Sequence, residues 1–146
     1  MNNLMLISMV GLIGGLAIGL QAPLASIINQ RIGILESVFI IHLGGLIAVS
    51  VLLLFSKGGN LAQWQTVPWY ALAGGVLGVT LISAQVYIIP NIGVAAALTL
   101  IIAGQLLMAT CVDHFGLLEI QAKSLSWERI SGLAIVLLGV WLTVKK

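Results

Sequence analysis

Apolar residues run along most of this chain in long blocks, and charged or turn-forming residues separate one block from the next. None of the blocks alternates apolar and polar residues with the period of two that a membrane-barrel strand requires. A membrane-spanning helix needs about 20 mostly apolar residues, because each residue adds about 1.5 Å across a hydrocarbon core of about 30 Å. The pattern therefore predicts five membrane-spanning helices, at about residues 4–28, 37–55, 68–89, 92–112 and 127–144.

Local signals place the ends of these predicted helices. Thr66 stands two residues before Pro68, which favours a helix start with Thr66 as its N-cap. The Pro90–Asn91 pair predicts a tight break between the third and fourth helices. All four tryptophans fall at or near block ends, as expected of the aromatic belts at the two membrane interfaces. They are Trp64, Trp69, Trp127 and Trp141.

The composition agrees with a membrane protein. Of the 146 residues, 60% are hydrophobic and 7% are charged, whereas a soluble domain is about 45–50% apolar and about 25% charged. The length predicts a single transmembrane domain over residues 1–146. The first block lacks the basic start of a signal peptide and is longer than its apolar region, so we expect it to be the first membrane helix.

The charged and reactive residues give no support to several function classes. The six basic residues are scattered, so nucleic-acid binding is not expected. Cys111 is the only cysteine, lies in an apolar run and is expected to be a buried structural thiol. Neither His42 nor His114 has a second ligand one helical turn away, so no metal site is expected. We find no paired catalytic carboxylates, phosphate loop or nucleophile–base pair, and expect neither an enzyme nor a cofactor.

The basic residues are balanced across the membrane. Five crossings place Lys57, Lys123 and Arg129 on one side and Arg31, Lys145 and Lys146 on the other, three on each side. The positive-inside rule needs an excess on one side to fix the orientation. Either another feature, such as the N-terminal amine, orients the chain, or the chain inserts both ways and pairs as an antiparallel dimer.

Small residues recur at intervals of four along the first and third predicted helices. This spacing lets helix backbones approach closely in lipid, where no hydrophobic effect drives helix association. We interpret these glycines as helix-packing residues, most of them inside one bundle. They are Gly11, Gly15 and Gly19 in the first helix and Gly74 and Gly78 in the third.

Polar side chains inside the apolar helices form the candidate site, because each must find a partner in lipid. In the first helix Asn29 follows Gln21 by eight residues, and in the fourth Asp113 follows Gln105 by the same spacing. Eight residues rise about 12 Å and rotate by about 80°, so each pair lies at two depths on one helix face. Gln85 lies in the third helix. These residues either line a polar cleft or bond across helices, with Asn29 and Asp113 at helix ends.

The chain also carries a set of short motifs in a fixed order. They are GLQAP at 19–23, Ile28-Asn29 with Gly33, GGVLG at 74–78, PNIGVA at 90–95, Gly104-Gln105, VDHFGL at 112–117 and RISG at 129–132. Together these motifs resemble the YdcZ family of inner-membrane exporters, within the drug/metabolite transporter (DMT) superfamily. The resemblance covers nearly the whole chain and rests on the set, because no single motif is decisive.

The resemblance implies an all-helical, five-helix unit, half of the ten-helix inverted-repeat fold of larger members. Such a unit works as an antiparallel dimer, with a second copy or with a sister protein. The expected function is a secondary transporter that exports a small organic solute across the bacterial inner (plasma) membrane. The alternatives are a non-transporting membrane subunit or chaperone that packs against a larger partner, and a passive channel.

Within a transporter, the polar residues of the membrane helices have separate expected roles. The expected solute-binding residues are Gln21, Gln105, Asn29 and Gln85. Asp113 is the candidate for proton coupling, because it is the only acid near a helix interior. Since no acid lies at mid-helix, the alternative is a neutral or anionic solute without proton coupling.

Overall fold

A computed structural model describes residues 3–56 and 59–145 of the chain. Within these residues the ordered elements are all helical and no strand occurs. Five helical spans are long and apolar enough to cross a membrane, which confirms the predicted number. They are Asn3–Ile32, Ile34–Phe55, Trp69–Ile92, Val94–Phe115 and Trp127–Val144.

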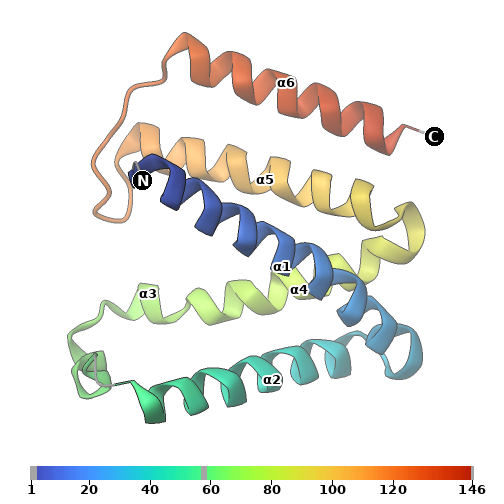
Figure 1. Cartoon of the computed structure of the whole chain (residues 1–146). Helices are drawn as coiled ribbons and strands as arrows, with labels where there is room; N and C mark the ends of the chain where they lie inside the picture. Colours follow the sequence, from blue (N-terminus) through green and yellow to red (C-terminus); the bar gives the residue numbers. More distant parts are fainter. Residues whose placement is uncertain (1–2, 57–58, 146) are drawn as a thin grey trace. The chain divides into compact units, whose positions relative to one another are not determined.

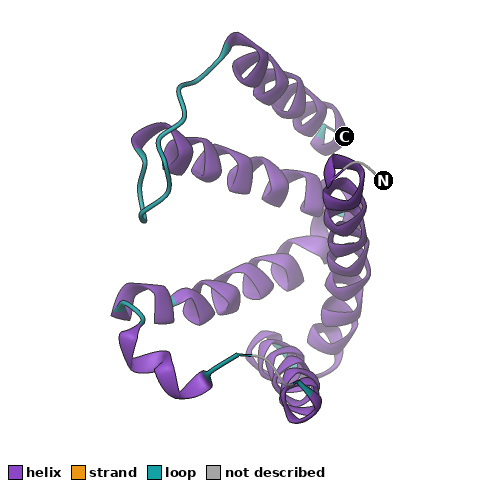
Figure 2. Ribbon diagram, turned by 60° about the vertical axis from the view of Figure 1, so that its left-hand side comes forward, coloured by secondary structure: helices purple, strands orange, loops and turns teal. Residues whose placement is uncertain are grey.

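The third span consists of two helices, and a short 3-10 helix precedes it. In chain order the elements are α1 (Asn3–Ile32), α2 (Ile34–Phe55), the 3-10 helix η1 (Leu61–Thr66), α3 (Trp69–Leu72), α4 (Gly74–Ile92), α5 (Val94–Phe115) and α6 (Trp127–Val144) (Figure 1). In the described part of the chain, irregular segments lie in the connections between these elements and after the end of α6 (Figure 2). The chain divides into two compact units, one ending at Tyr87 and the other beginning at Ile88.

Single glycines make two of the helix connections. Gly33 joins α1 to α2 with a φ of 111°, and Gly93 joins α4 to α5 with a φ of 84°. Each glycine N–H donates to the carbonyl four residues earlier, at 3.0 Å for Gly33 and 2.9 Å for Gly93. The chain therefore turns while these backbone groups stay paired, as a lipid environment requires. A positive φ is costly for a residue with a Cβ, so both turns favour glycine.

The predicted break at Pro90–Asn91 is wrong, because α4 continues past Pro90 and the turn lies at Gly93. Proline has no N–H, so it leaves the carbonyl four residues earlier, that of Val86, without its helical donor. The side-chain amide nitrogen of Asn29 donates to this carbonyl oxygen at 2.9 Å. A donor from α1 thus replaces the missing bond, and the helix tolerates the proline.

Other predicted boundaries differ by a few residues. α1 continues to Ile32 and α2 begins at Ile34, so the charged residues near this turn lie within helices. Thr66 is not the N-cap of α3. Its hydroxyl donates to the Gln63 carbonyl oxygen at 2.8 Å, inside η1, and α3 begins after Pro68 without a side-chain cap. Charged and cap-forming residues indicate where a helix nears the membrane surface. Helices continue into the headgroup region, so these residues locate the helix ends only to within a few residues.

The tryptophans lie at or near the ends of the helical spans, and their place at the membrane interfaces stays a prediction. Trp69 begins α3, Trp127 begins α6, and Trp141 lies in the last turn of α6. Trp64 lies in η1, between two membrane spans. The Nζ of Lys145 lies 4.5 Å from the centre of a Trp141 ring, a cation–π contact that suits this end of α6.

In the first unit a small core joins α1, α2 and α4. Its buried residues are Ala25 from α1, Val38 from α2, and Ile82 and Val86 from α4. The buried hydroxyl of Ser37 donates to the Ala25 carbonyl oxygen at 2.6 Å and links α2 to α1. In the second unit α5 packs along α6.

The prediction that Cys111 is buried is wrong, because the thiol is exposed on α5. In a soluble protein an apolar run around a cysteine favours burial. In a membrane helix lipid accepts apolar side chains as readily as a protein core does, so an apolar run does not distinguish the two surroundings.

Candidate functional site

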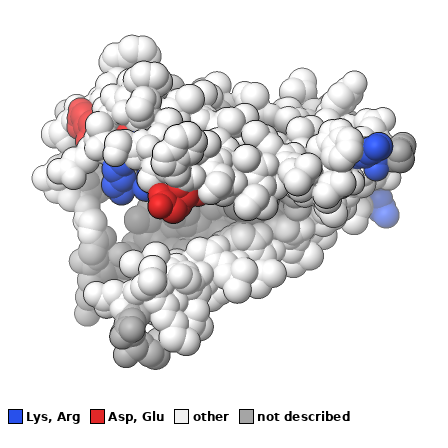
Figure 3. All heavy atoms as spheres, turned by 90° about the horizontal axis from the view of Figure 1, so that it is seen from above, with Lys and Arg blue, Asp and Glu red and all other residues white. Residues whose placement is uncertain are grey.

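Charged side chains are sparse, and nearly all atoms on the face shown in Figure 3 belong to uncharged residues. The few polar side chains within the apolar helices are therefore the candidates for a functional site. One group of them lines a hollow of about 380 Å³ in the first unit, among α1, α2 and α4. The residues around this hollow are Gln21, Ile41, His42, Gly45, Leu46, Gly78, Leu81 and Ile82.

The backbone of α2 fixes the orientation of His42. Its Nδ1 lies 2.8 Å from the Val38 carbonyl oxygen. A carbonyl oxygen only accepts hydrogen bonds, so Nδ1 carries the hydrogen and donates, and the lone pair of the neutral ring lies on Nε2. A Cβ added at Gly78 of α4 would lie 3.2 Å from this Nε2. Glycine at position 78 thus leaves the space into which the imidazole extends.

Gln21 lines the same hollow from α1. The structure therefore places the predicted solute-binding residue Gln21 at a site that His42 shares. Sequence spacing did not predict this pairing, because the two residues lie on different helices. The turn at Gly33 was the missing information, since it sets which residues of α1 and α2 lie at the same depth.

Two further predicted residues, Asn29 and Gln85, lie in the first unit outside the lining of this hollow. The amide nitrogen of Asn29 is occupied by its bond to the Val86 carbonyl oxygen. Gln85 is only 1% exposed, and its Oε1 has no hydrogen-bond partner among the described residues. A buried acceptor without a donor costs about 1–3 kcal/mol. A water, a solute or a neighbouring chain would remove that cost by donating a hydrogen bond.

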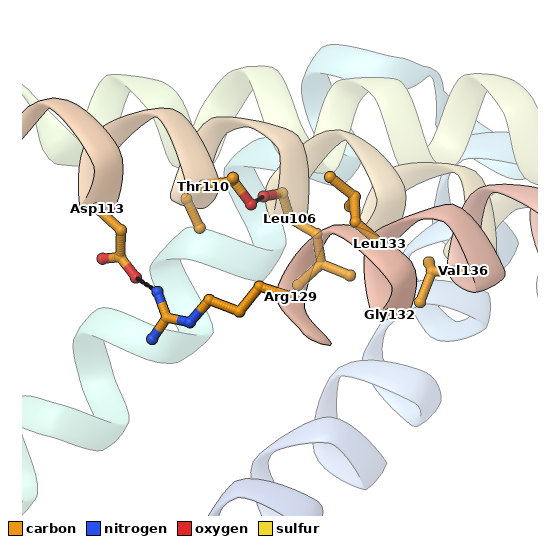
Figure 4. A pocket seen from close by; sticks show the side chains of 8 residues that line it. Leu106, Thr110, Asp113, Arg129, Gly132, Leu133 and Val136 are labelled. Carbon is orange, nitrogen blue, oxygen red and sulfur yellow. Dashed lines mark hydrogen bonds and ion pairs between the residues drawn. The ribbon is translucent and has the colours of Figure 1, made fainter. Parts of the chain in front are cut away.

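A second hollow, of about 400 Å³, lies between α5 and α6 in the second unit. An ion pair closes one end of it, with Arg129 Nη1 3.3 Å from Asp113 Oδ2 (Figure 4). Arg129 is 47% exposed and Asp113 38%, so water or headgroups screen this pair. The rest of the lining is mostly apolar: Leu106, Ala109, Thr110, Gly132, Leu133 and Val136.

The local chain holds this ion pair in place. Ser126 caps the start of α6 by accepting a hydrogen bond from the Arg129 N–H at 3.4 Å. The Lys123 N–H donates to the Asp113 backbone carbonyl oxygen at 2.7 Å and ties the connecting segment to the end of α5.

The remaining predicted site residue of the second unit is exposed. Gln105 lies on α5 and does not line the hollow beside α6. His114 is also exposed, and its ring packs edge-to-face on Phe115 with centres 4.9 Å apart. Neither residue is buried by the single chain.

The five predicted packing glycines fall into two groups. Within the described chain, a Cβ added at Gly11, Gly15, Gly19 or Gly74 would meet no atom within 4 Å. Gly78 differs, because it faces His42. The glycine stripe of α1 is therefore open in the described single chain, contrary to the expectation that most of these glycines pack inside one bundle.

The sequence analysis did not predict that Arg129 pairs with Asp113, although the connection between their helices indicates that the two residues lie close together. A short connection joins the two predicted helices, so the end of one and the start of the next must lie on the same membrane side. It also missed the buried hydroxyls of Ser26 and Ser37. Serine inside an apolar block gives no direct sign of burial, because it can also bond to its own helix.

The comparison with protein families decides the class. A family model described as "Putative inner membrane exporter, YdcZ" matches residues 6–142. The chain belongs to the YdcZ family. This confirms the family expected from the sequence motifs. No curated protein and no solved structure matches the chain.

Membership of the YdcZ family fixes several coarse properties. The chain is a multi-pass protein of the inner membrane, and its class is that of a membrane transporter. The family match reaches from α1 into α6. Both hollows of this YdcZ family member, the one at His42 and the one at Asp113, therefore lie within the matched residues.

The contact between Gly78 and His42 makes a testable prediction. Alanine in place of a helical glycine usually stabilises a helix by about 0.5–1 kcal/mol. At Gly75 we expect that gain, because an added Cβ would meet no atom within 4 Å. At Gly78 the Cβ would press on the imidazole at 3.2 Å, so Gly78→Ala should lose the gain or reverse it. Melting curves of the two variants in the same detergent measure the difference, and equal shifts would show that His42 does not lie against α4.

Proposed function

We propose that this chain is a secondary transporter that exports a small organic solute across the bacterial inner membrane. Polar side chains at exposed positions of apolar helices are the observation that carries the proposal. Gln21 and Gln105 are exposed in the single chain, although both lie within spans long enough to cross the membrane. An unsatisfied amide in lipid costs several kcal/mol. A second protein surface together with a solute would satisfy both amides.

A second copy in the opposite orientation supplies that surface in our proposal. The open glycine stripe of α1 suits close approach by another helix. Two copies would cover their polar residues and enclose a path for the solute between them. A sister protein of the same family would serve equally well. The solute would meet Gln21 and Gln105, with Asn29 and Gln85 as further contacts. Gln85 Oε1 has no hydrogen-bond partner in the described part of the chain.

The balanced basic residues support insertion in both orientations. Arg31 lies in the last turn of α1, Arg129 in the first turn of α6, and Lys145 directly after α6. Lys123 lies in the segment before α6. Lys57 and Lys146, which complete the count, lie outside the described residues.

We therefore expect wild-type C-termini on both sides of the membrane. Reporters that are active on only one side, fused to the C-terminus, should both give a signal in one population. Two or three lysines added to the Lys123 segment should move nearly all chains to one orientation, because they create the missing excess. A single orientation of the wild type, with no sister protein present, would contradict the homodimer.

Counterflow in liposomes that contain only this protein separates the proposed function from its alternatives. Solutes that co-purify with the chain are identified by mass spectrometry and supplied in labelled form. A transporter exchanges labelled for unlabelled solute and accumulates the label transiently. A passive channel lets the label equilibrate without accumulation, and a non-transporting subunit gives no flux.

A further inference from the structure

Among the described residues that line the hollow in the first unit, one side chain is titratable. Gln21 from α1 and Gly78, Leu81 and Ile82 from α4 surround His42, and none of them carries a charge or titrates. The residues that α2 itself adds, Ile41, Gly45 and Leu46, are also uncharged. A proton taken up by this hollow therefore goes to the His42 imidazole.

The hydrogen bond of Nδ1 decides which atom exchanges that proton. Nδ1 stays bonded to the Val38 carbonyl oxygen at 2.8 Å, so protonation takes place at Nε2. Nε2 extends toward Gly78 of α4. In the neutral ring Nε2 accepts a hydrogen bond, and in the protonated ring it donates one and carries positive charge. One atom thus changes both its hydrogen-bonding role and its charge.

We propose that Nε2 of His42 is the proton-exchanging atom of the transport site, and that the neutral ring accepts a hydrogen bond from an N–H or O–H group of an uncharged solute. This inference rests on the proposed transport function. A proton that binds the Nε2 lone pair breaks the hydrogen bond to the solute, which then leaves. When the proton passes to water on the other side, the lone pair accepts the next solute. One proton moves in for each solute that moves out.

The lining of the hollow selects an uncharged solute. No described lining residue is a carboxylate, so a cation would lack a counter-charge there. An anion would bind with the protonated ring, and proton and solute would then travel in the same direction. The volume of about 380 Å³ lies within the usual range of small-molecule sites. Gln21 offers a second hydrogen-bonding group to such a solute.

Asp113 is the competing candidate for the proton carrier. It lies in the other hollow with Arg129 Nη1 3.3 Å from its Oδ2. Two variants therefore separate the candidates. His42→Gln keeps a polar side chain but removes the titrating group, and Asp113→Asn removes the carboxylate and leaves His42 in place.

The proton site is tested by nitrogen NMR of the full chain in nanodiscs, labelled at histidine. The chain has two histidines, so His114→Gln leaves His42 as the only signal. The probes are benzamide, an uncharged N–H donor; benzylammonium, a cation; and toluene, which has no polar group. Benzamide at about 100 times its dissociation constant should lower the pH midpoint of His42 by about two pH units, because it binds the neutral ring. Toluene should leave the midpoint unchanged, and benzylammonium should lower it less than benzamide.

Proton release gives the second readout. Added benzamide should release protons from wild-type protein near the His42 midpoint, up to one per site, as reported by a pH-indicator dye. Asp113→Asn should release the same amount and His42→Gln none. An unchanged His42 midpoint with benzamide, an equal shift with toluene, or equal release from His42→Gln would overturn the inference. Both measurements report binding and do not require transport. A negative result in the counterflow experiment would therefore be distinguishable from a negative result here.

Discussion

Replacing Asn29 with alanine is expected to lower the free energy of unfolding by about 1–3 kcal/mol. The side-chain amide nitrogen of Asn29 donates a hydrogen bond to the Val86 carbonyl oxygen at 2.9 Å. This bond replaces the one that the missing N–H of Pro90 would have made. In a Pro90→Ala background the same replacement should cost much less, because residue 90 then has an N–H that bonds Val86 within α4. Unfolding of the wild type, both single variants and the double variant in the same bicelles measures this coupling.

A neighbouring residue provides the control for that cycle. Gln30 follows Asn29 in α1, and its amide nitrogen donates to the Ser26 hydroxyl at 3.4 Å within the same helix. Gln30→Ala should combine additively with Pro90→Ala, because the two residues share no partner. If Asn29→Ala costs the same with and without the proline, then Asn29 is not what makes Pro90 tolerable inside α4.

Replacing Gln105 with alanine is expected to weaken solute binding by about 1–3 kcal/mol, or about 5- to 150-fold in the dissociation constant. The melting temperature of the chain should change little, because Gln105 is exposed on α5. Gln21→Ala should behave in the same way, since Gln21 is also exposed. Both quantities are measured on one purified sample, with a co-purified solute identified by mass spectrometry.

Gln63 gives a matched control, because it is an exposed glutamine in η1, outside the membrane spans. Gln63→Ala should change neither the affinity nor the melting temperature. A Gln105→Ala protein that melts earlier but binds solute with unchanged affinity would make Gln105 a helix-contact residue. The solute-binding role would then fall to the residues of the first unit.

The number of apolar helices followed from the sequence, because long apolar blocks have few structural outcomes in a bilayer. The ends of helices were harder to predict. The sequence placed a break at Pro90 because proline removes a helical hydrogen bond. The structure keeps the helix because Asn29 replaces that bond from another helix. Only the contact between Asn29 and Val86 in the folded chain shows that the hydrogen bond lost at Pro90 is replaced.

The sequence predicted some residues of the candidate site, but it did not predict which of them lie next to one another. Gln21 was identified from its polarity, but its neighbour His42 depends on the turn at Gly33 and on the space left by Gly78. Arg129 was counted as a membrane-orienting charge, whereas the structure pairs it with Asp113. Both contacts link residues from different helices. The spacing of residues along one helix shows which of them share a face, but it does not show which residues of another helix they meet.

Flux driven by a proton gradient shows whether this chain transports a solute without any other membrane protein. Purified protein in liposomes, with no other membrane protein, faces a proton gradient and a labelled co-purified solute. We expect the solute to accumulate above its starting concentration on the acidic side, and the accumulation to disappear when an ionophore collapses the gradient. A solute that binds the protein but never accumulates, with both orientations present in the liposomes, would show that this chain alone does not transport it.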